Sequence, residues 1–296
     1  MMKAIGAEMH DATGAFAIEV GNGAPRILDM CIAPGGFLVT ALSKSPGATA
    51  VGFSLPKSHG GHQTLAPLSD KVRVRYLDIT MLAEDLGLAG RIPADHPDKD
   101  NFLPRQLGEH EDFHLVLCDG QVLRTHTRPA YREHCEARRL TLTQLVLGLE
   151  HLRPGGTLVA LLHRVESWNC VQLLQDFSRI ADVKLFKHAR YHAKRSSFYM
   201  VARNVRSRSP EALAAVARWK KGWEAATFRL GEQEWEEFRR QEPDPHEVLR
   251  EFGEELVRLG SGVWETQADA LDRAPFTRTG RGRGADARGG GSGGQG

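Results

Sequence analysis

The chain has 296 residues, of which 41% are hydrophobic and 26% are charged, close to the averages of soluble globular proteins. These values exclude collagen-like, mucin-like and wholly disordered chains, and they allow a sizeable buried core. The 39 Lys and Arg residues nearly balance the 37 Asp and Glu residues, so a net charge of +2 by itself indicates no polyanionic partner.

Two features of the sequence bear on where the protein works. No apolar run approaches the roughly 18 residues of a membrane helix, and the N-terminal residues show no secretory signal pattern. The cysteines are far apart and form no CxxC pair, which indicates neither a disulfide framework nor a zinc site: Cys31, Cys118, Cys135 and Cys170. We therefore expect an intracellular protein, in the cytoplasm or the nucleus, with no membrane partner.

Residues 1–205 alternate short apolar runs with longer helical patterns. The expected helices are 2–17, 36–44, 131–152 and 167–180, and the expected strands are 26–32, 48–54, 72–77, 113–119, 157–163, 183–186 and 198–203. Strands separated by helices pair in parallel, and nearly continuous apolar runs are typical of strands covered on both faces. The sequence predicts an α/β fold with a mostly parallel seven-stranded sheet, helices on both faces and a ligand site at the carboxyl ends of the strands.

The rest of the chain differs from this domain. Residues 206–260 predict a helical extension that begins at Ser209-Pro210, where Ser caps the helix and Pro takes its first position. An aromatic stripe recurs among its charges, either to pack on the main domain or to bind a partner: Trp219, Trp223, Phe228, Trp235 and Phe238. Residues 261–296 are rich in Gly and Arg and cannot bury enough apolar area to offset the entropy of ordering, so we expect a disordered tail.

One motif follows the first expected strand and reads Asp29-Met-Cys-Ile-Ala-Pro-Gly35-Gly36-Phe37. Two glycines allow the backbone to come close to a ligand, and the helix that follows presents free N–H groups. Asp29 is placed to order the loop or to reach the ligand through water. The motif is not the GxGxxG fingerprint, which argues against a nucleotide-dependent oxidoreductase. A plain strand-to-helix turn is the alternative interpretation.

This motif resembles the D-x-x-x-A-P-G-G-[FW] signature that opens the FtsJ-like (RrmJ-type) 2′-O-ribose RNA methyltransferase family. Further segments match the family's later motifs in order and spacing: 51–56, 76–80, 113–120, 152–159 and 187–202. The resemblance covers about residues 2–205 and implies a Rossmann-like methyltransferase fold.

The resemblance also implies a cofactor, S-adenosyl-L-methionine, with its methionine part over Gly35 and Phe37. Asp78 would accept from the adenine amino group, and Asp119 would face the methyl donor and the substrate as the catalytic carboxylate. Ser54 stands where relatives carry an acidic residue for the ribose hydroxyls, and a hydroxyl makes fewer such bonds than a carboxylate. The expected cofactor-binding residues are Asp29, Gly35, Gly36, Phe37, Ser54, Asp78 and Asp119.

The family's catalytic Lys-Asp-Lys-Glu tetrad is only partly matched. Asp119 matches the aspartate, but Leu161 stands at the central lysine and Ser197 at the glutamate. Lys3 is a loose match for the first lysine. Leucine carries no charge and no hydrogen-bonding group, so the resemblance implies a degenerate catalytic set.

His163 is the one replacement for the missing lysine that the strand pattern offers. Residues 161 and 163 of a strand face the same way, so the imidazole would enter the same cleft one pleat further out. Arg164 and Lys194 are other cations nearby in the sequence. A lone histidine near a strand end is, in the alternative interpretation, an ordinary polar residue.

Two further patterns concern binding. Residues 184–208 hold eight Lys and Arg residues and no acidic residue, interleaved with Tyr191, Phe198 and Tyr199. This stretch, Lys184 to Arg208, predicts RNA binding through phosphate neutralisation, and a solvated hairpin is the alternative. His59 and His62 follow the second motif without a third metal ligand, so we expect solvated or cofactor-edge histidines rather than a metal site.

Two functions remain open. The first is an S-adenosylmethionine-dependent methyltransferase, acting on RNA ribose 2′-hydroxyls with an altered catalytic set. The second is a catalytically inactive FtsJ-like protein that binds S-adenosylmethionine, RNA or both.

Overall fold

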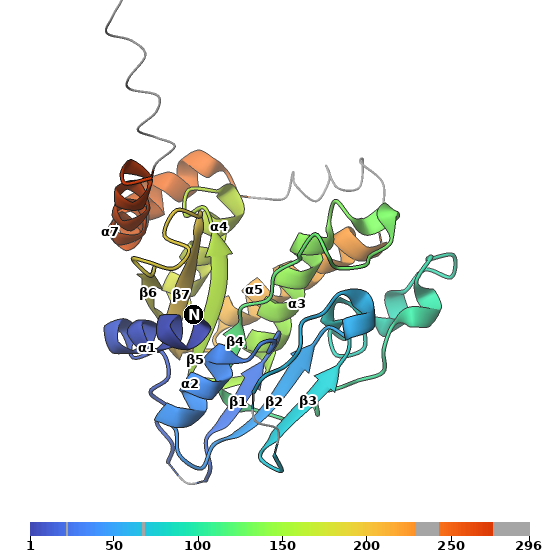
Figure 1. The fold of residues 1–296 in the computed structure, drawn as a ribbon. Helices are drawn as coiled ribbons and strands as arrows, with labels where there is room; N and C mark the ends of the chain where they lie inside the picture. Colours follow the sequence, from blue (N-terminus) through green and yellow to red (C-terminus); the bar gives the residue numbers. More distant parts are fainter. Residues whose placement is uncertain (22, 67–68, 229–242, 275–296) are drawn as a thin grey trace, which may run out of the picture.

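The computed structural model describes residues 1–21, 23–66, 69–228 and 243–274. Within them, a seven-stranded sheet has the order β3-β2-β1-β4-β5-β7-β6 (Figure 1). β7 runs antiparallel to both of its neighbours, and the other pairs are parallel. The strands are β1 (Arg26–Asp29), β2 (Thr49–Ser54), β3 (Val72–Tyr76), β4 (Phe113–Cys118), β5 (Leu152–His163), β6 (Asp182–Phe186) and β7 (Ser197–Val205). The predicted α/β fold is confirmed.

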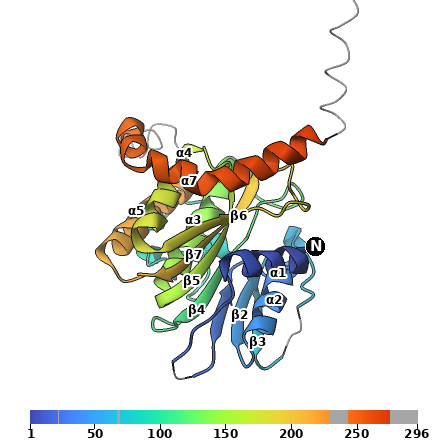
Figure 2. The same ribbon diagram turned by 90° about the vertical axis from the view of Figure 1, so that its left-hand side faces the viewer.

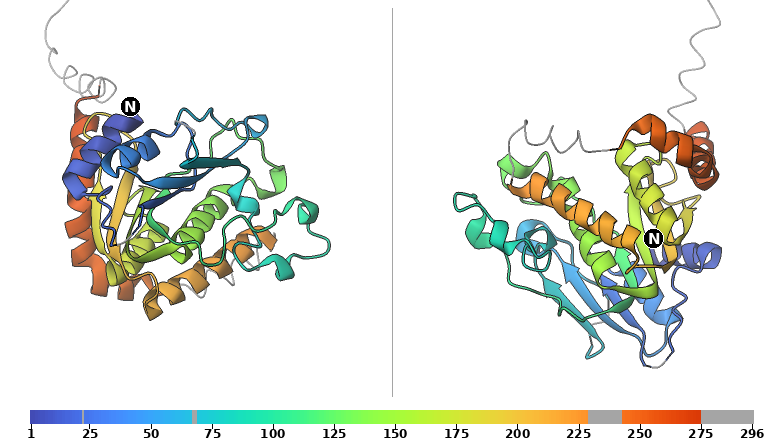
Figure 3. Two further views of the ribbon diagram at one scale, coloured as in Figure 1. Left: turned by 90° about the horizontal axis from the view of Figure 1, so that it is seen from below. Right: turned by 180° about the vertical axis from the view of Figure 1, so that it is seen from behind.

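Helices cover both faces of the sheet, as Figures 2 and 3 show. α1 (Met2–Thr13) and α2 (Gly36–Lys44) lie on one face. α3 (Glu136–Glu150), α4 (Trp168–Ile180) and α5 (Pro210–Phe228) lie on the other, and α7 (Pro245–Asp272) packs beside α4 and the edge strand β6. Because helices cover both faces of the sheet, the loops gather at the ends of the strands.

The strand pattern explains the two apolar cores. Successive strand residues point to opposite faces, so Ile27 joins the core under α1 and α2, whereas Leu28 joins the core under α3, α4 and α5. Leu115 and Val116 of β4 divide in the same way. Burial of each such side chain stabilises the fold by about 1.5–3 kcal/mol, which is why central strands read as unbroken apolar runs.

Three element boundaries differ from the sequence-based ones by four or five residues. α1 ends at Thr13 rather than at residue 17, because Gly14 takes a left-handed conformation with φ of 72°. α3 begins at Glu136, after a short 3-10 turn at Ala130–Arg132. β5 begins at Leu152 and includes Pro154, because a register shift against β4 accommodates a residue that has no N–H to donate.

The C-terminal helices belong to the main core. Trp219 and Trp223 of α5 are buried in the core that contains α3 and the sheet, as the aromatic stripe predicts. α7 runs to Asp272, so the expected boundary at residue 260 falls inside a helix whose apolar stripe continues through Val263. Trp235, Phe238 and residues 275–296 lie outside the described residues. Across the described ranges, we find no helix with the length and apolarity that crossing a membrane requires.

Candidate active site

A cavity of about 430 Å³ opens where the carboxyl ends of β1, β2, β4 and β5 meet. The segments that form it are the β1–α2 turn, the loops after β2 and β4, the end of β5, the β6–β7 loop and the start of α1. Its polar lining residues include Ser54, His62, Asp119, Gln121, His126, His163, His192, Arg195, Ser197 and Tyr199. This is the edge at which parallel α/β sheets bind their ligands.

Two carboxyl groups lie next to each other at this cavity, one in its lining and one buried behind it. Asp119 follows β4 and lines the cavity, and Asp29 ends the neighbouring strand β1 with its Oδ1 accepting from the Cys31 N–H at 3.2 Å. Burial raises the pKa of Asp119 to about 7. Burial and the adjacent Asp119 charge raise the pKa of Asp29 well above its usual value. No positively charged group among the described residues lowers the pKa of either carboxyl, so the pair is electrostatically suited to a cationic ligand.

The corner after Asp119 is held rigidly. The Gly120 N–H donates to Oε1 of Gln144, on the buried side of α3, at 2.9 Å. A Cβ at residue 120 would overlap the Cys31 sulfur, so only glycine fits this close approach of two strand ends. The position of the Asp119 carboxyl is therefore fixed by packing from β1 and α3.

The glycine pair after β1 serves packing within the protein. Gly35 has φ of 101°, and a Cβ there would lie 2.8 Å from Cβ of Ala66. A Cβ on Gly36 would overlap Met2, because the start of α1 crosses directly over it. The space next to both Cα atoms is thus filled by the chain's own residues. Ala33 and Pro34 of the same turn line the cavity instead.

The expected cofactor residues separate into two groups. Ser54 and Asp119 line the main cavity, and Asp78 lines a smaller adjoining cavity of about 60 Å³. Lining residues shared by both cavities are Cys31, Leu55, Gln121 and His126. The remaining residues, Asp29, Gly35, Gly36 and Phe37, lie behind the lining. Phe37 packs edge-on against Tyr199, with ring centroids 5.1 Å apart.

Asp78 is tied into a buried network of charges. Its Oδ1 accepts from the N–H and hydroxyl of Thr80 at 2.9 and 2.8 Å, and its Oδ2 lies 3.6 Å from the Arg132 guanidinium. Arg132 also lies 3.4 Å from both Asp98 and Glu136. These contacts orient the Asp78 carboxyl group, and its Oδ2 retains the capacity to accept a further hydrogen bond.

The two positions that the resemblance aligns with the tetrad lysine and glutamate reach the cavity. Leu161 and Ser197 both line it, and His163 lines it one pleat beyond Leu161, as strand alternation predicts. Lys3 is exposed and is not among the lining residues. Among the described residues, the cavity lining contains no lysine, and Arg195 is its one permanent cation.

Lys187 has a structural task that its sequence position did not reveal. Its buried ammonium donates to the carbonyls of Arg195 at 2.6 Å, Ser197 at 2.7 Å and His192 at 3.4 Å. Burial lowers the pKa of Lys187 to about 8. All three donors are used, so this side chain closes the β6–β7 loop around itself rather than neutralising a phosphate.

The basic stretch 184–208 does not form one surface. Arg195 lines the cavity, whereas Arg206 and Arg208 donate to the carbonyls of Arg179 and Glu150. β7, which separates Arg195 from Arg206 and Arg208 along the chain, spans about 26 Å from Ser197 to Val205. The basic residues that are close together in the sequence therefore lie at opposite ends of the sheet.

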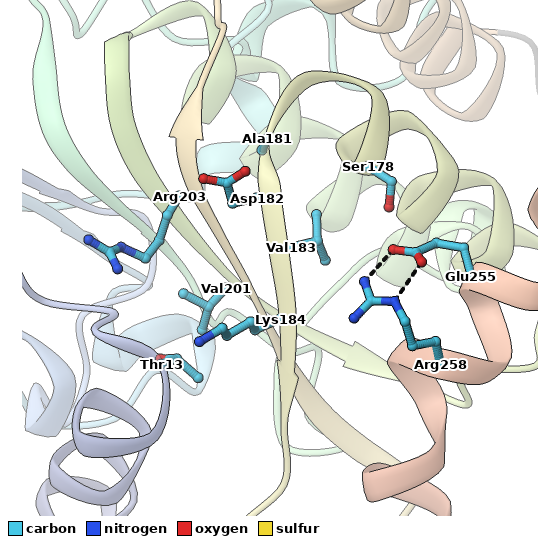
Figure 4. Close-up of a pocket in the computed structure, with 10 residues that line it drawn as sticks. All are labelled: Thr13, Ser178, Ala181, Asp182, Val183, Lys184, Val201, Arg203, Glu255 and Arg258. Atoms are coloured by element: carbon cyan, nitrogen blue, oxygen red, sulfur yellow. Dashed lines mark hydrogen bonds and ion pairs between the residues drawn. The ribbon is translucent and has the colours of Figure 1, made fainter.

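A second cavity, of about 470 Å³, lies at the β6 edge of the sheet (Figure 4). Lys184 and Arg203 extend into it from one face of β6 and β7, and Glu255 and Arg258 of α7 form an ion pair on its other side, with Nε and Oε2 2.6 Å apart. Its described lining includes no residue from the loops at the carboxyl ends of the parallel strands.

The predicted histidines differ in position. His59 is exposed and lies 3.2 Å from the Ser58 hydroxyl, whereas His62 lines the main cavity. In the described ranges, no group of three or more His, Cys, Asp or Glu residues is arranged to hold a metal ion.

Sequence reasoning missed several lining residues, above all Gln121 and His192. Gln121 comes two residues after Asp119, just beyond the end of β4. The rule that ligands bind just after strands would therefore have found it. His192 lies in a loop whose path depends on the Lys187 contacts, and no local pattern indicates it.

Comparison with known proteins identifies the family. The sequence profile described as FtsJ-like methyltransferase matches residues 7–205. No curated protein sequence matches the chain. Human methyltransferase-like protein 13, solved in complex with SAH, is 13% identical with a TM-score of 0.41, covering 73% of this chain and 91% of that one.

Two bacterial structures are similar at the same level. An O-methyltransferase family protein from Burkholderia thailandensis is 13% identical with a TM-score of 0.37, covering 69% of this chain and 57% of that one. An rRNA methylase from Streptococcus thermophilus is 13% identical with a TM-score of 0.38, covering 67% and 96%. The match to the sequence profile, rather than these distant structures, is what bears on the reaction.

Proposed function

Because the chain belongs to the FtsJ-like methyltransferase family, we propose that it transfers the methyl group of S-adenosylmethionine to ribose 2′-hydroxyls of RNA, with only part of the family's catalytic tetrad. When bound, this cofactor supplies a sulfonium-activated methyl group. The other parts of the reaction fall to side chains of the cavity.

The observation that carries the proposal is the Asp119 carboxyl in the cavity lining, with the Asp29 carboxyl directly behind it. Asp29, which is buried, and Asp119, which is partly exposed to the cavity, are close enough for their charges to interact, and no described cation is paired with either carboxyl. A sulfonium about 5 Å from an ionised Asp119 would gain about 3 kcal/mol at an effective dielectric constant of 20. The residues present therefore fit a cationic cofactor, and the raised pKa of Asp119 indicates a carboxyl that such a cation would ionise.

Other lining residues have tasks that suit a nucleoside. The Ser54 hydroxyl is placed at the carboxyl end of β2 to bond a ribose hydroxyl. Oδ2 of Asp78, in the adjoining cavity, is placed to accept from an adenine amino group. With one hydroxyl in place of a carboxylate at residue 54, we expect cofactor affinity weaker by about 1–2 kcal/mol than with an acidic residue there.

The β6–β7 loop supports RNA as the substrate. Arg195 lines the cavity, and Arg190 lies on the same loop with its guanidinium 5.7 Å from the Tyr191 ring centroid. Cations beside the cleft neutralise phosphates next to the target ribose, and the half-buried Tyr191 ring offers a partial stacking surface. This loop, rather than the whole stretch 184–208, is the RNA contact that we propose.

A second candidate function has its own support. Leu161 and Ser197 line the cavity at the positions of the tetrad lysine and glutamate, and the described lining contains no lysine. Loss of one such group costs about 10²–10³ in rate. These replacements favour a protein that binds the cofactor and RNA without transferring the methyl group.

Calorimetry and methyl transfer separate these candidates. We expect calorimetry to show S-adenosylmethionine binding, and labelled methyl groups to appear in total RNA as alkali-resistant 2′-O-methyl dinucleotides. Binding without incorporation would identify the inactive binder, and Leu161→Lys with Ser197→Glu should then start transfer if the cleft is otherwise intact. No binding at millimolar cofactor would refute both.

RNA binding is tested through its salt dependence. Arg195→Ala should weaken RNA binding and reduce the slope of log affinity against log salt by about one. Arg206→Ala removes a cation of the same stretch at the far end of β7 and is the matched control, with no change of slope expected. Equal effects of both variants would refute the assignment of the contact to the β6–β7 loop.

A further inference from the structure

We propose that His163 is the base that accepts the proton of the substrate hydroxyl, in place of the lysine that relatives carry at position 161. This inference rests on the proposed function, because it names the residue that carries out the proton transfer there. Its argument uses the strand register, the neighbours of the imidazole and the composition of the cavity lining.

The strand geometry places the imidazole near the missing ammonium. Leu161 and His163 are two residues apart on β5 and line the same cavity as Asp119. Histidine is shorter than lysine, but it starts one pleat, about 6.6 Å, nearer the end of the strand. The shorter histidine side chain therefore reaches the same part of the cavity as a lysine at residue 161, because its Cα lies nearer the end of the strand.

The register with β7 links the two replaced positions. His163 pairs directly with Ser197, and Leu161 pairs with Tyr199. Directly opposite residues of an antiparallel pair share a face, with Cβ atoms about 4.5–5.5 Å apart. A glutamate at residue 197 would therefore lie beside the imidazole and favour its protonated form. Serine leaves the ring neutral, so loss of the glutamate and use of a histidine base are consistent with each other.

Contacts of the ring fix its tautomer. The Gln121 side-chain Nε2 lies 3.2 Å from Nε2 of His163, and with the amide in this orientation its nitrogen donates, which requires the tautomer that accepts at Nε2 and carries its proton on Nδ1. Burial, then the charges of Lys187 and Arg164, lower the pKa of His163. Gln121 thereby holds the lone pair in the cavity, at the position that a substrate hydroxyl would take by displacing the amide.

The reaction balances with this base. The substrate oxygen forms a bond to the methyl carbon as the sulfur–carbon bond breaks and its electron pair stays on sulfur. The hydroxyl proton passes to Nε2 of His163, which becomes an imidazolium. Exposure of His163 at the cavity mouth lets water take this proton before the next turnover.

Chemical rescue tests the role directly. His163→Gly should lower methyl transfer by about 10²-fold or more, because general bases contribute about 10²–10⁴, while calorimetry shows unchanged cofactor binding. Added imidazole should restore at least a tenfold gain in this variant. The matched control is His192→Gly, which removes an imidazole from the same cavity at a residue whose φ of 56° glycine tolerates. Imidazole should not accelerate that variant.

Nitrogen-15 NMR supplies a readout that does not depend on turnover. We expect His163 at pH 7 as the neutral ring protonated on Nδ1, with the Nε2 signal of a bare nitrogen. An imidazolium, or a ring protonated on Nε2, would overturn the proposal.

The activity assay distinguishes failure of this inference from failure of the proposed function. Wild-type transfer with an equally active His163→Gly variant would overturn the histidine base and leave the proposed function standing. Cofactor binding without any wild-type transfer would overturn both.

Discussion

Replacing the buried carboxylate by its amide, Asp119→Asn, should make the protein more stable at alkaline pH while removing a group on which we expect function to depend. Asp119 has its pKa raised to about 7 by burial, whereas an aspartate of the unfolded chain titrates near 3.8. The folded state therefore binds this proton more tightly, so stability falls as pH rises between these two values. Asparagine has the same shape and carries no charge, so it does not lose stability in this way.

The magnitude follows from the two pKa values. A difference of about three units corresponds to about 4 kcal/mol once both states are ionised. At pH 5 the folded state is still protonated, and the penalty is about 2 kcal/mol; by pH 8 it reaches about 4 kcal/mol. The stabilisation of Asp119→Asn over wild type should grow by about 2 kcal/mol across this range. Removal of the Asp119 charge also relieves Asp29, which acts in the same direction.

Urea denaturation of the cofactor-free protein at pH 5 and pH 8 measures this difference. Asp95→Asn, at an exposed aspartate, is the matched control and should stay within about 0.5 kcal/mol of wild type at both pH values. An Asp119→Asn protein no more stable than wild type at pH 8 would refute the reasoning. A stabilisation of constant size at both pH values would do so as well, because it would not come from titration.

Three further predictions follow from the site. Preference for S-adenosylmethionine over the uncharged-sulfur product S-adenosylhomocysteine should rise between pH 6 and pH 8 as Asp119 ionises, and a pH-independent affinity ratio in calorimetry would contradict this. Ser197→Glu should raise the pKa of His163 by about one unit, measured by NMR titration, because a carboxylate would face the ring across the β5–β7 pair; an unmoved pKa would contradict the register. Gly36→Ala should lower the free energy of unfolding by about 1–3 kcal/mol, because the added methyl group overlaps the first turn of α1, whereas Gly90→Ala, in open space, should change it by less than about 0.5 kcal/mol; equal effects would show that α1 does not cover this turn.

Strand alternation gave the most reliable sequence-based expectation about the site. It placed Leu161 and His163 on one face, and both line the cavity. Side-chain direction in a strand depends only on the period of two, so position along the chain suffices to infer it. Asp119 at the end of β4 follows from the same kind of local argument, since the carboxyl ends of parallel strands meet at one edge.

The glycine pair shows the limit of motif reasoning. Gly35 and Gly36 indicate a close approach, and the structure shows one, but α1 and Ala66 make it rather than a ligand. Glycine reports that space next to the backbone is needed and does not report what fills it. The basic stretch has the same limit, because a run of one charge sign says nothing about which end of a strand each side chain occupies.

The sequence alone determined the alternating strands and helices, the order of the sheet's motifs and the carboxylates at the strand ends, because all of these depend on local periodicity and turn chemistry. Tertiary structure decided which residues meet. Gln121 contacts His163, which is 42 positions away in the chain. Lys187 donates all three of its hydrogen bonds to loop carbonyls. Such contacts depend on strand register and on how loops pack, which bring together segments that are distant in the sequence. No local sequence pattern therefore predicts them.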